Sequence, residues 1–519
     1  MNGQPPNVDS LIADLPRGRF EGDIGDPPSA CFASPRDILA TESLRFDAER
    51  NRQCKIFLGV CGADIHVGPR LKDGRVSRYA LGGVPIGIGD DRHIVTIAGS
   101  RSGKGRSVLV GNAISLLDTS MVIIDPKGDL ARLTASWRAK HQEVGILDPF
   151  GISGDHISQY RVVYNAIDTL MKSDQKTFVP NAKLIADSLI VGGDSQHEHW
   201  DDCARSILAG LCSHAATHVN YEGRRDLITV WQLASELARP DPNNRHQYVL
   251  EKEMIANDAA DGAVRAAARS FYDRTGGEFS SVLSNLRKHL DWISIGCTHS
   301  VLRGPSTDLG NLKRTPSTLY VTTPALRMAD MSGWQRLVVQ LAFAAHEEER
   351  VSHGNQTVFM LDEFSVLGRL KCAETAIAQL AGLGVKVWIV VQGISQLKSN
   401  YDENWETFIA NAGVLQFFGG ADETTLSYVS KLLGETETLS RSASASTYDQ
   451  AVKEAASGLS WSIASQPLMT ASELAQYFGR DDKLLRQLII RPSYRPMILQ
   501  RAFYDKHELF RDRFFREAA

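Results

Sequence analysis

The chain has 519 residues, of which 43% are hydrophobic and 23% charged, and its formal net charge is −4. That length allows two or three domains with large cores, and that charge excludes a basic field over the whole surface but not a local basic patch. The seven cysteines form no C-x-x-C pair, and no run approaches about 20 apolar residues. We therefore expect a cytoplasmic protein with reduced thiols, without a signal peptide and without direct insertion in a membrane.

The N-terminal part of the chain contains few long apolar runs. Residues 1–50 mix proline, glycine and acidic residues, which predicts an N-terminal arm or linker. Two short β-prone runs, Ile56–Gly59 and Val84–Gly89, are separated by glycines and predict hairpins.

A strand, a Gly/Ser-rich loop and the start of a helix follow one another from Ile94. The run Ile94–Ala98 is β-prone, and Lys104 stands where the helix should begin. The N–H groups of such a loop can surround phosphate oxygens, and Lys104 can reach the β- and γ-phosphates of a nucleotide. The residues that we expect to contact the nucleotide are Gly99, Ser100, Arg101, Ser102, Gly103, Lys104, Gly105 and Arg106.

Two positions of this loop depart from the usual G-x-x-x-x-G-K-[ST] pattern. Ala98 replaces the first glycine, and Gly105 replaces the residue whose hydroxyl binds Mg²⁺. The loop alone therefore leaves open a plain glycine-rich turn between a strand and a helix.

Strands and helices alternate after the loop. The apolar runs 120–124 and 144–147 predict strands, each followed by polar residues, and residues 129–139 predict the helix between them. This alternation is typical of a parallel sheet with its ligand at the carboxyl edge. We place the first part of a nucleotide-binding domain at residues 51–175.

The pattern changes to amphipathic helices with almost no strand between about residues 178 and 292. We therefore predict an all-α domain, residues 176–305, inserted into the α/β domain. The run from His197 to Cys203 contains several metal-ligand residue types, but its spacing matches no metal motif, so we interpret it as the solvated start of a helix.

Residues 306–519 predict the second part of the nucleotide-binding domain. Strands are expected at 317–323, 357–361, 386–391, 413–418, 488–490 and 497–500. The low-complexity run 440–447 predicts a loop, and the tail 511–516 predicts a short helix.

Three polar residues at the ends of these strands complete a P-loop ATPase. Asp362 is expected to hold Mg²⁺, and Glu363 beside it to polarise the attacking water. Gln392, at the end of the next strand, is expected to sense the γ-phosphate. Together with Lys104 as the phosphate lysine, these residues predict ATP and Mg²⁺ as cofactors and hydrolysis as the reaction.

Five motifs then make the chain resemble the TraG-like coupling ATPases of bacterial conjugation and type IV secretion. These motifs are Ser100–Gly105, Asp125–Leu130, Leu361–Gly368, Val391–Leu397 and Tyr428–Gly434. The resemblance extends over roughly residues 90–505, and it explains Gly105, because this family commonly has glycine after the lysine. It implies a RecA-like motor with an inserted all-α domain that recognises cargo or the relaxosome. It also implies a hexameric ring around single-stranded DNA, and it assigns Lys104, Asp362, Glu363 and Gln392 the roles given above.

Two features depart from that family. Its members usually begin with transmembrane helices, which this sequence lacks, and many carry an arginine before a Gly-x-Gly where this chain has Ala381. An arginine from the neighbouring subunit commonly stabilises the γ-phosphate in ring ATPases, so we expect slow basal hydrolysis.

We therefore predict a coupling protein that binds DNA or a DNA–protein cargo, relaxosome or effector, and couples ATP turnover to its transfer through a type IV secretion channel. The cysteine usage and the lack of a long apolar run favour the cytoplasm, with recruitment to the inner membrane by a partner left open. Two alternatives remain at this stage. One is a nucleotide-switched cargo adaptor without sustained turnover, and the other is a HerA/FtsK-like DNA translocase unrelated to secretion.

Overall fold

The computed structural model describes residues 30–70, 74, 76–192, 198–274, 276–349, 355–443 and 459–516. Most of the predicted N-terminal arm, residues 1–29, lies outside this range. Residues 30–50 contain one short helix, α1 (Pro35–Ala40), and they lie against the central sheet through the buried side chains of Phe32 and Phe46. Among the described residues, no helix is both long enough and apolar enough to cross a membrane.

An 11-stranded sheet is the centre of the molecule, in the strand order β4-β1-β17-β16-β13-β5-β12-β11-β6-β10-β7. Its strands are β1 (Ile56–Cys61), β4 (Val84–Ile88), β5 (His93–Ala98), β6 (Ser120–Asp125), β7 (Glu143–Leu147), β10 (Ser317–Thr322), β11 (Thr357–Leu361), β12 (Val385–Val391), β13 (Ala412–Phe418), β16 (Arg486–Ile490) and β17 (Met497–Gln500). From β13 to β7 every neighbouring pair is parallel, whereas the pairs from β4 to β13 are antiparallel. This arrangement confirms the predicted α/β fold with a mainly parallel sheet.

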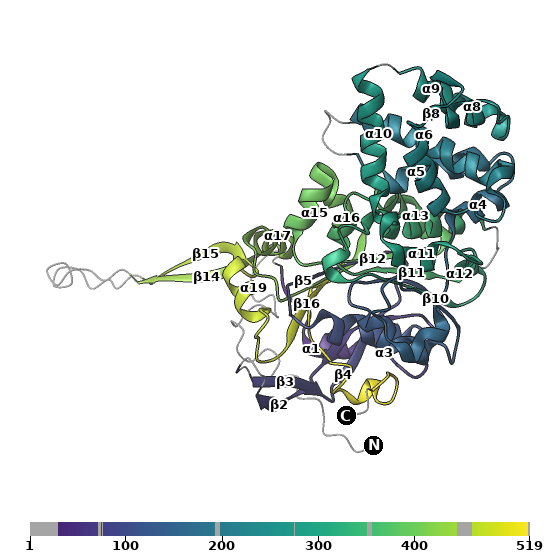
Figure 1. Ribbon diagram of the computed structural model, residues 1–519. Helices are drawn as coiled ribbons and strands as arrows, with labels where there is room; N and C mark the ends of the chain where they lie inside the picture. Colours follow the sequence, from purple (N-terminus) through teal and green to yellow (C-terminus); the bar gives the residue numbers. More distant parts are fainter. Residues whose placement is uncertain are drawn as a thin grey trace.

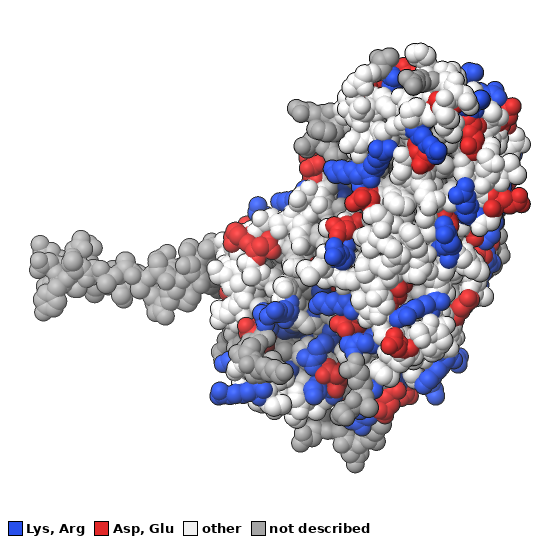
Figure 2. Space-filling view, in the orientation of Figure 1, with Lys and Arg blue, Asp and Glu red and all other residues white. Residues whose placement is uncertain are grey.

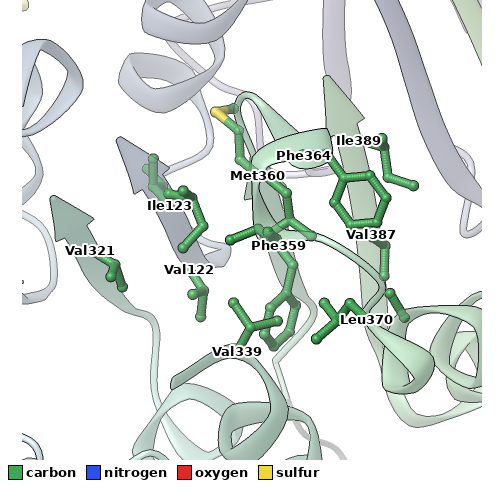
Figure 3. Packing of buried hydrophobic residues seen from close by; sticks show 14 of the residues in the cluster. Val122, Ile123, Val321, Val339, Phe359, Met360, Phe364, Leu370, Val387 and Ile389 are labelled. Carbon is green, nitrogen blue, oxygen red and sulfur yellow. The ribbon is translucent and has the colours of Figure 1, made fainter. Parts of the chain in front are cut away.

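The inner parallel strands β5, β6, β11 and β12 are buried along their whole length because helices cover both faces of the sheet. Figure 3 shows Phe359 of β11 between Val122 of β6 and Val387 of β12, with Val339 of the covering helix below it. These helices are α2 (Val110–Ser115), α3 (Asp129–Arg138), α13 (Ser332–Glu348), α14 (Lys371–Gln379), α15 (Ile394–Tyr401), α16 (Trp405–Ala410), α17 (Glu423–Leu433) and α19 (Ala471–Tyr477). The packing fixes the strand ends, and therefore the residues that follow them, in one rigid edge.

A group of helices between β7 and β10 rises above the sheet at the top of Figure 1. Its helices are α4 (Ala166–Lys172), α5 (Phe178–Leu189), α6 (Glu198–Thr217), α7 (Leu227–Glu236), α8 (Val249–Ile255), α9 (Ala263–Tyr272), α10 (Gly277–Leu290) and α11 (His299–Leu302), with one short hairpin of β8 (Pro240–Asp241) and β9 (Asn244–Tyr248). The short helix α12 (Asn311–Arg314) follows the group and lies beside β10. The chain leaves and returns at one place, because Val163 forms a parallel bridge with Ser306. We use "the helical insert" below for residues 166–305.

Two local predictions near the C-terminus are wrong. Residues 440–443 belong to strand β14 (Glu435–Ala443), which pairs with β15 (Leu459–Pro467) in the hairpin that projects at the left of Figure 1, and 444–447 lie outside the described residues. Alternating Thr, Ser and Leu residues suit a strand when an antiparallel partner is available. The predicted tail helix 511–516 is also absent, because the only helical turn described there spans Glu508–Phe510, just before it. One further hairpin, β2 (Asp64–Arg70) with β3 (Val76–Leu81), lies outside the central sheet.

Candidate functional site

The loop after β5 has a shape that only glycine permits at its first residue. A Cβ atom on Gly99 would lie 1.9 Å from the carbonyl oxygen of Gly419, in the turn after the neighbouring strand β13. Two later residues of the loop have positive φ, 56° at Arg101 and 90° at Gly103. The loop is thus held in one compact shape by its own backbone and by the adjacent turn.

The helix after this loop begins with a π-helical turn, Gly105–Leu109, and continues as α2. Its N-terminus points its free N–H groups toward the loop, which is the arrangement that favours an anion. A Cβ on Gly105 would meet no heavy atom within 4 Å, and Gly105 is not among the glycines with positive φ. Gly105 is therefore not required by space or by backbone conformation, unlike Gly99.

Four predicted residues come together at the carboxyl ends of three adjacent strands, β5, β12 and β11. The Lys104 Nζ lies 2.7 Å from Asp362 Oδ1 and 2.7 Å from Glu363 Oε1. The side-chain amide of Gln392 donates to both carboxylate oxygens of Glu363, at 3.2 and 3.0 Å. The parallel order of the strands produces this cluster, because the residues that follow neighbouring parallel strands emerge at the same edge.

The charges of this cluster are largely shielded from water, with 15–22% of the side chains of Lys104, Asp362 and Glu363 exposed. Burial opposes the charge of Lys104, but the two carboxylates outweigh it and raise the lysine pKa. Burial raises the pKa of Asp362, although Lys104 opposes that shift. The lysine therefore stays protonated and serves as the counter-ion of both acids.

Glu363 has a backbone conformation that is uncommon for a side-chain-bearing residue, with φ 54° and ψ 43°. It begins the turn Phe364–Leu367 directly after β11, and its N–H donates to Asp362 Oδ1 at 3.0 Å. This left-handed turn directs the two adjacent acids toward the same lysine. Strained backbone of this kind is concentrated at functional sites.

Asp125, at the end of β6 beside this cluster, is an acid that the sequence analysis gave no role. It is buried, and its Oδ2 accepts a hydrogen bond from the N–H of Ala131 at 2.9 Å. Burial raises the pKa of Asp125 to about 7, and the charges of Asp129 and Asp362 contribute in the same direction. Asp125 thus adds a third acid to the edge of the sheet at which Lys104 pairs with Asp362 and Glu363.

The sequence analysis also missed Arg501, which follows β17. Its guanidinium is buried, donates to the Ser102 carbonyl at 2.6 Å and lies 5.0 Å from the centroid of the Phe418 ring. Burial lowers the pKa of Arg501 to about 10. No sequence signal links residues 102 and 501, because the antiparallel flank of the sheet brings them together.

The remaining predicted loop residues differ in exposure. Ser100 and Arg101 are exposed, whereas Ser102 is buried. Arg106 forms two hydrogen bonds with Asp505 Oδ1, at 3.0 and 2.7 Å, and stacks on the Phe503 ring. The side chain of Arg106 is therefore held against the C-terminal segment in this structure.

Ala381 stands where many relatives carry an arginine, and two basic residues close to it in the sequence, Arg369 and Lys386, already have partners. Ala381 lies in the helical turn Leu380–Leu383. Lys386 is buried and donates to the Asp90 carbonyl, and Arg369 pairs with Glu374 at 3.2 Å.

Comparison with known proteins identifies the family of this chain. A family model described as Type IV secretory system Conjugative DNA transfer matches residues 57–518. The conjugal transfer protein TraG of Escherichia coli is 29% identical over 412 residues, which are 75% of this chain and 62% of TraG. The protein VirD4 of Agrobacterium fabrum is 24% identical over 381 residues, 70% of this chain and 52% of VirD4. The chain thus spans between half and about three fifths of the length of these curated relatives.

Solved structures of the bacterial conjugative coupling protein TrwB share the fold. An unbound form has a TM-score of 0.59 at 17% identity and covers 83% of this chain and 90% of TrwB. A complex of TrwB with a non-hydrolysable GTP analogue has a TM-score of 0.60 at 15% identity, and covers 93% of this chain and 98% of TrwB.

Proposed function

This chain belongs to the family of type IV secretory system conjugative DNA transfer proteins, and we propose that it is the ATP-hydrolysing coupling protein of such a system. In this proposal it binds DNA or a DNA–protein cargo and couples ATP turnover to transfer through the secretion channel. The observation that carries the proposal is the cluster of Lys104, Asp362, Glu363 and Gln392 beside the phosphate loop. TrwB has been solved with a non-hydrolysable ATP analogue and with ADP and Mg²⁺, which supports the same cofactors here.

The residues present fit a magnesium nucleotide. The loop is held in its compact shape by the close approach of Gly99 to Gly419, and two carboxylates lie beside Lys104. Asp362 would hold Mg²⁺, which supplies positive charge to the phosphate oxygens when bound. Gly105 has no hydroxyl to offer, and Mg²⁺ readily keeps a water in such a position.

We assign the chemistry to the chain's own residues as follows. Lys104 releases at least one of its two carboxylate partners and binds the nucleotide phosphates instead, because a single positive charge cannot neutralise both carboxylates and the phosphates. Glu363 then accepts a proton from the attacking water. Gln392 orients the Glu363 carboxylate through its two hydrogen bonds, and it links that carboxylate to the end of β12.

We propose further that the active form is a homo-hexamer around single-stranded DNA. On the face shown in Figure 2, lysines and arginines alternate with aspartates and glutamates, so this face carries no field of one sign. The proposal therefore assigns the DNA to another surface, such as the lumen of a ring. The helical insert recognises the cargo, and a channel component recruits the protein to the inner membrane.

A nucleotide-switched adaptor is the second candidate. One observation favours it. Lys104 is already paired with two carboxylates, so the site without nucleotide is a stable state that does not depend on ATP turnover. The HerA/FtsK-like alternative has less support than the other two, because the family model that matches describes conjugative transfer.

The test is steady-state ATP turnover by the full chain with and without single-stranded DNA, alongside the mass of the assembly. Glu363→Gln keeps the size and the hydrogen bonds of the residue but removes the charge, so it should bind ATP and turn over at least about 10²-fold more slowly. Turnover stimulated by DNA supports the coupling motor. Tight ATP binding by the wild type without turnover would favour the adaptor, and unchanged turnover in Glu363→Gln would remove Glu363 from the mechanism.

A further inference from the structure

A second cluster of charged and metal-ligating groups lies in the helical insert, away from the nucleotide site. His214 of α6, His218 just after α6 and Glu253 of α8 meet there. Glu253 Oε1 lies 3.4 Å from His214 Nε2 and 3.2 Å from His218 Nδ1. The three donor atoms all lie within 4.8 Å of one another.

The helix fixes the two histidines on one side. They are four residues apart, and the N–H of His218 donates to the carbonyl of His214 at 2.9 Å in the last turn of α6, although the backbone of His218 itself is extended, with φ −78° and ψ 138°. Two histidines with this spacing on one helix, joined by a carboxylate from elsewhere, form a recurrent zinc-binding arrangement.

The burial of His214 is the second observation. Its side chain is 0% exposed, and its Nε2, which faces Glu253, has no hydrogen-bond partner. Buried polar atoms in native proteins are almost always satisfied, and this nitrogen has only the long contact with Glu253, so a metal ion bound by both groups would satisfy it. His218 and Glu253 are 21% and 23% exposed, so this group can come from solvent.

The distances suit a metal ion. Zinc bonds to imidazole nitrogen and carboxylate oxygen are about 2.0–2.2 Å long, which puts neighbouring ligand atoms of a tetrahedral site roughly 3.3–3.6 Å apart. The two separations from Glu253 Oε1, 3.4 and 3.2 Å, lie at or near that range, and the two imidazole nitrogens lie within 4.8 Å of each other. We propose that His214, His218 and Glu253 bind one Zn²⁺ ion, with water as the fourth ligand.

The residues around the cluster leave room for this site, but two of their hydrogen bonds to the histidines would change when the metal binds. The Tyr221 hydroxyl donates to Glu253 Oε1 at 2.7 Å and orients the carboxylate. The Asn257 amide nitrogen lies 3.0 Å from His214 Nδ1. A metal on Nε2 puts the ring proton on Nδ1, so the Asn257 amide must turn to accept it. The long contact of 3.3 Å between the Asn220 N–H and His218 Nδ1 is given up as well.

Another cluster in the same insert, at the opposite end of α6, offers a matched control. His199, Cys203 and Glu278 also lie close together, but Arg274 pairs with Glu278 and supplies the positive charge. His199 is 64% exposed. Among the residues that the structure describes, no lysine or arginine forms an ion pair with Glu253. The carboxylate in the first cluster is therefore available to a cation, and the one in the second is not.

Such an ion would join the C-terminal end of α6 to α8 and close the intervening chain, which includes α7 and the β8–β9 hairpin. It would stabilise the helical insert in the way that structural zinc stabilises small domains. This inference does not depend on the proposed function.

The experiment is zinc binding to the full chain, purified without a polyhistidine tag and treated with a chelator. Zinc is titrated in competition with a chromophoric chelator, and Co²⁺ is used as a spectroscopic probe of tetrahedral coordination. We expect one Zn²⁺ per chain, a tetrahedral Co²⁺ spectrum and a rise in the Tm on zinc addition. Glu253→Gln and His218→Ala, at partly exposed positions, should bind at least about tenfold more weakly while keeping the circular dichroism spectrum. His199→Ala should bind as the wild type does.

Three results would overturn the proposal. The first is absence of zinc binding by the wild type. The second is binding by Glu253→Gln and His218→Ala that is as tight as that of the wild type. The third is loss of zinc binding in His199→Ala. The first would mean that the three side chains form a hydrogen-bonded cluster only, and the last would assign the metal to the cluster of His199, Cys203 and Glu278.

Discussion

The Lys104 cluster at the edge of the sheet and the histidine cluster of the helical insert both contain partly buried carboxylates, but they differ in the source of the positive charge beside them. At the sheet edge the protein supplies its own cation, and Lys104 lies 2.7 Å from each of two acids. In the insert, Glu253 is surrounded by two imidazoles and the Tyr221 hydroxyl, without a fixed cation among the described residues. In the first cluster each acid already has an ion-pair partner, which the proposed nucleotide would have to displace, whereas the second cluster would gain its cation from the proposed metal ion.

The largest expected effect is that of Gly99→Ala, which tests the shape of the loop after β5. Gly99→Ala places a Cβ against the Gly419 carbonyl, which must move by more than 1 Å, and a misplacement of that size can cost about 10²-fold in rate. We expect ATP turnover to fall at least that much. Gly105→Ala, in the same loop but with open space around it, should change turnover by no more than about twofold. Equal effects of the two substitutions on turnover would show that the loop is not pre-shaped.

Gln392→Ala tests how the sheet edge orients its acid. It removes both hydrogen bonds to the Glu363 carboxylate but leaves the Lys104 contact in place. We expect kcat to fall roughly tenfold with little change in KM, because the interaction acts on the base and not on the bound phosphates. A change confined to KM would mean that Gln392 contacts the nucleotide instead.

The support behind the loop should show as a stability effect. Arg501→Met removes the donor to the Ser102 carbonyl and should lower the free energy of unfolding by about 1–3 kcal/mol, which denaturant titration can measure. Arg511→Ala, at an exposed position ten residues on, is the control and should change it little. An Arg501→Met protein as stable as the wild type would mean that the loop needs no support from β17.

The helical insert should respond to acid through His289 of α10. Burial lowers the pKa of His289 to about 4, although Asp201 opposes that shift, and the ring titrates near 6.5 when unfolded. The unfolded chain therefore binds more protons between these values, so this contribution is present above pH 6.5 and is lost as the pH falls toward 4. The loss is at most about 1.4 kcal/mol per pH unit. His289→Gln should show a smaller loss in unfolding titrations at pH 7, 6 and 5, and equal slopes would contradict the assignment.

The two clusters also show what a sequence can and cannot predict. Lys104, Asp362, Glu363 and Gln392 could be predicted to meet because each follows a strand, and parallel strands end at a common edge. The contact of Arg501 with Ser102 could not be predicted. It depends on the order of the strands in the antiparallel part of the sheet, and the local sequence does not reveal that order. The spacing of His214 and His218 is visible in the sequence, but Glu253 joins them only through the packing of α8 on its neighbours. The prediction of a loop at 440–447 failed for a similar reason, since a strand partner lies beyond that window.

The most direct test of the central claim is ATP turnover by Lys104→Ala, compared with Lys127→Ala. Lys127 is an exposed lysine after β6, close to the same edge of the sheet. The account predicts that folded Lys104→Ala loses turnover by at least about 10²-fold, because the charge that positions the phosphates is gone, while Lys127→Ala keeps it. Near-normal turnover by a folded Lys104→Ala protein would contradict the claim that this cluster is the ATP site.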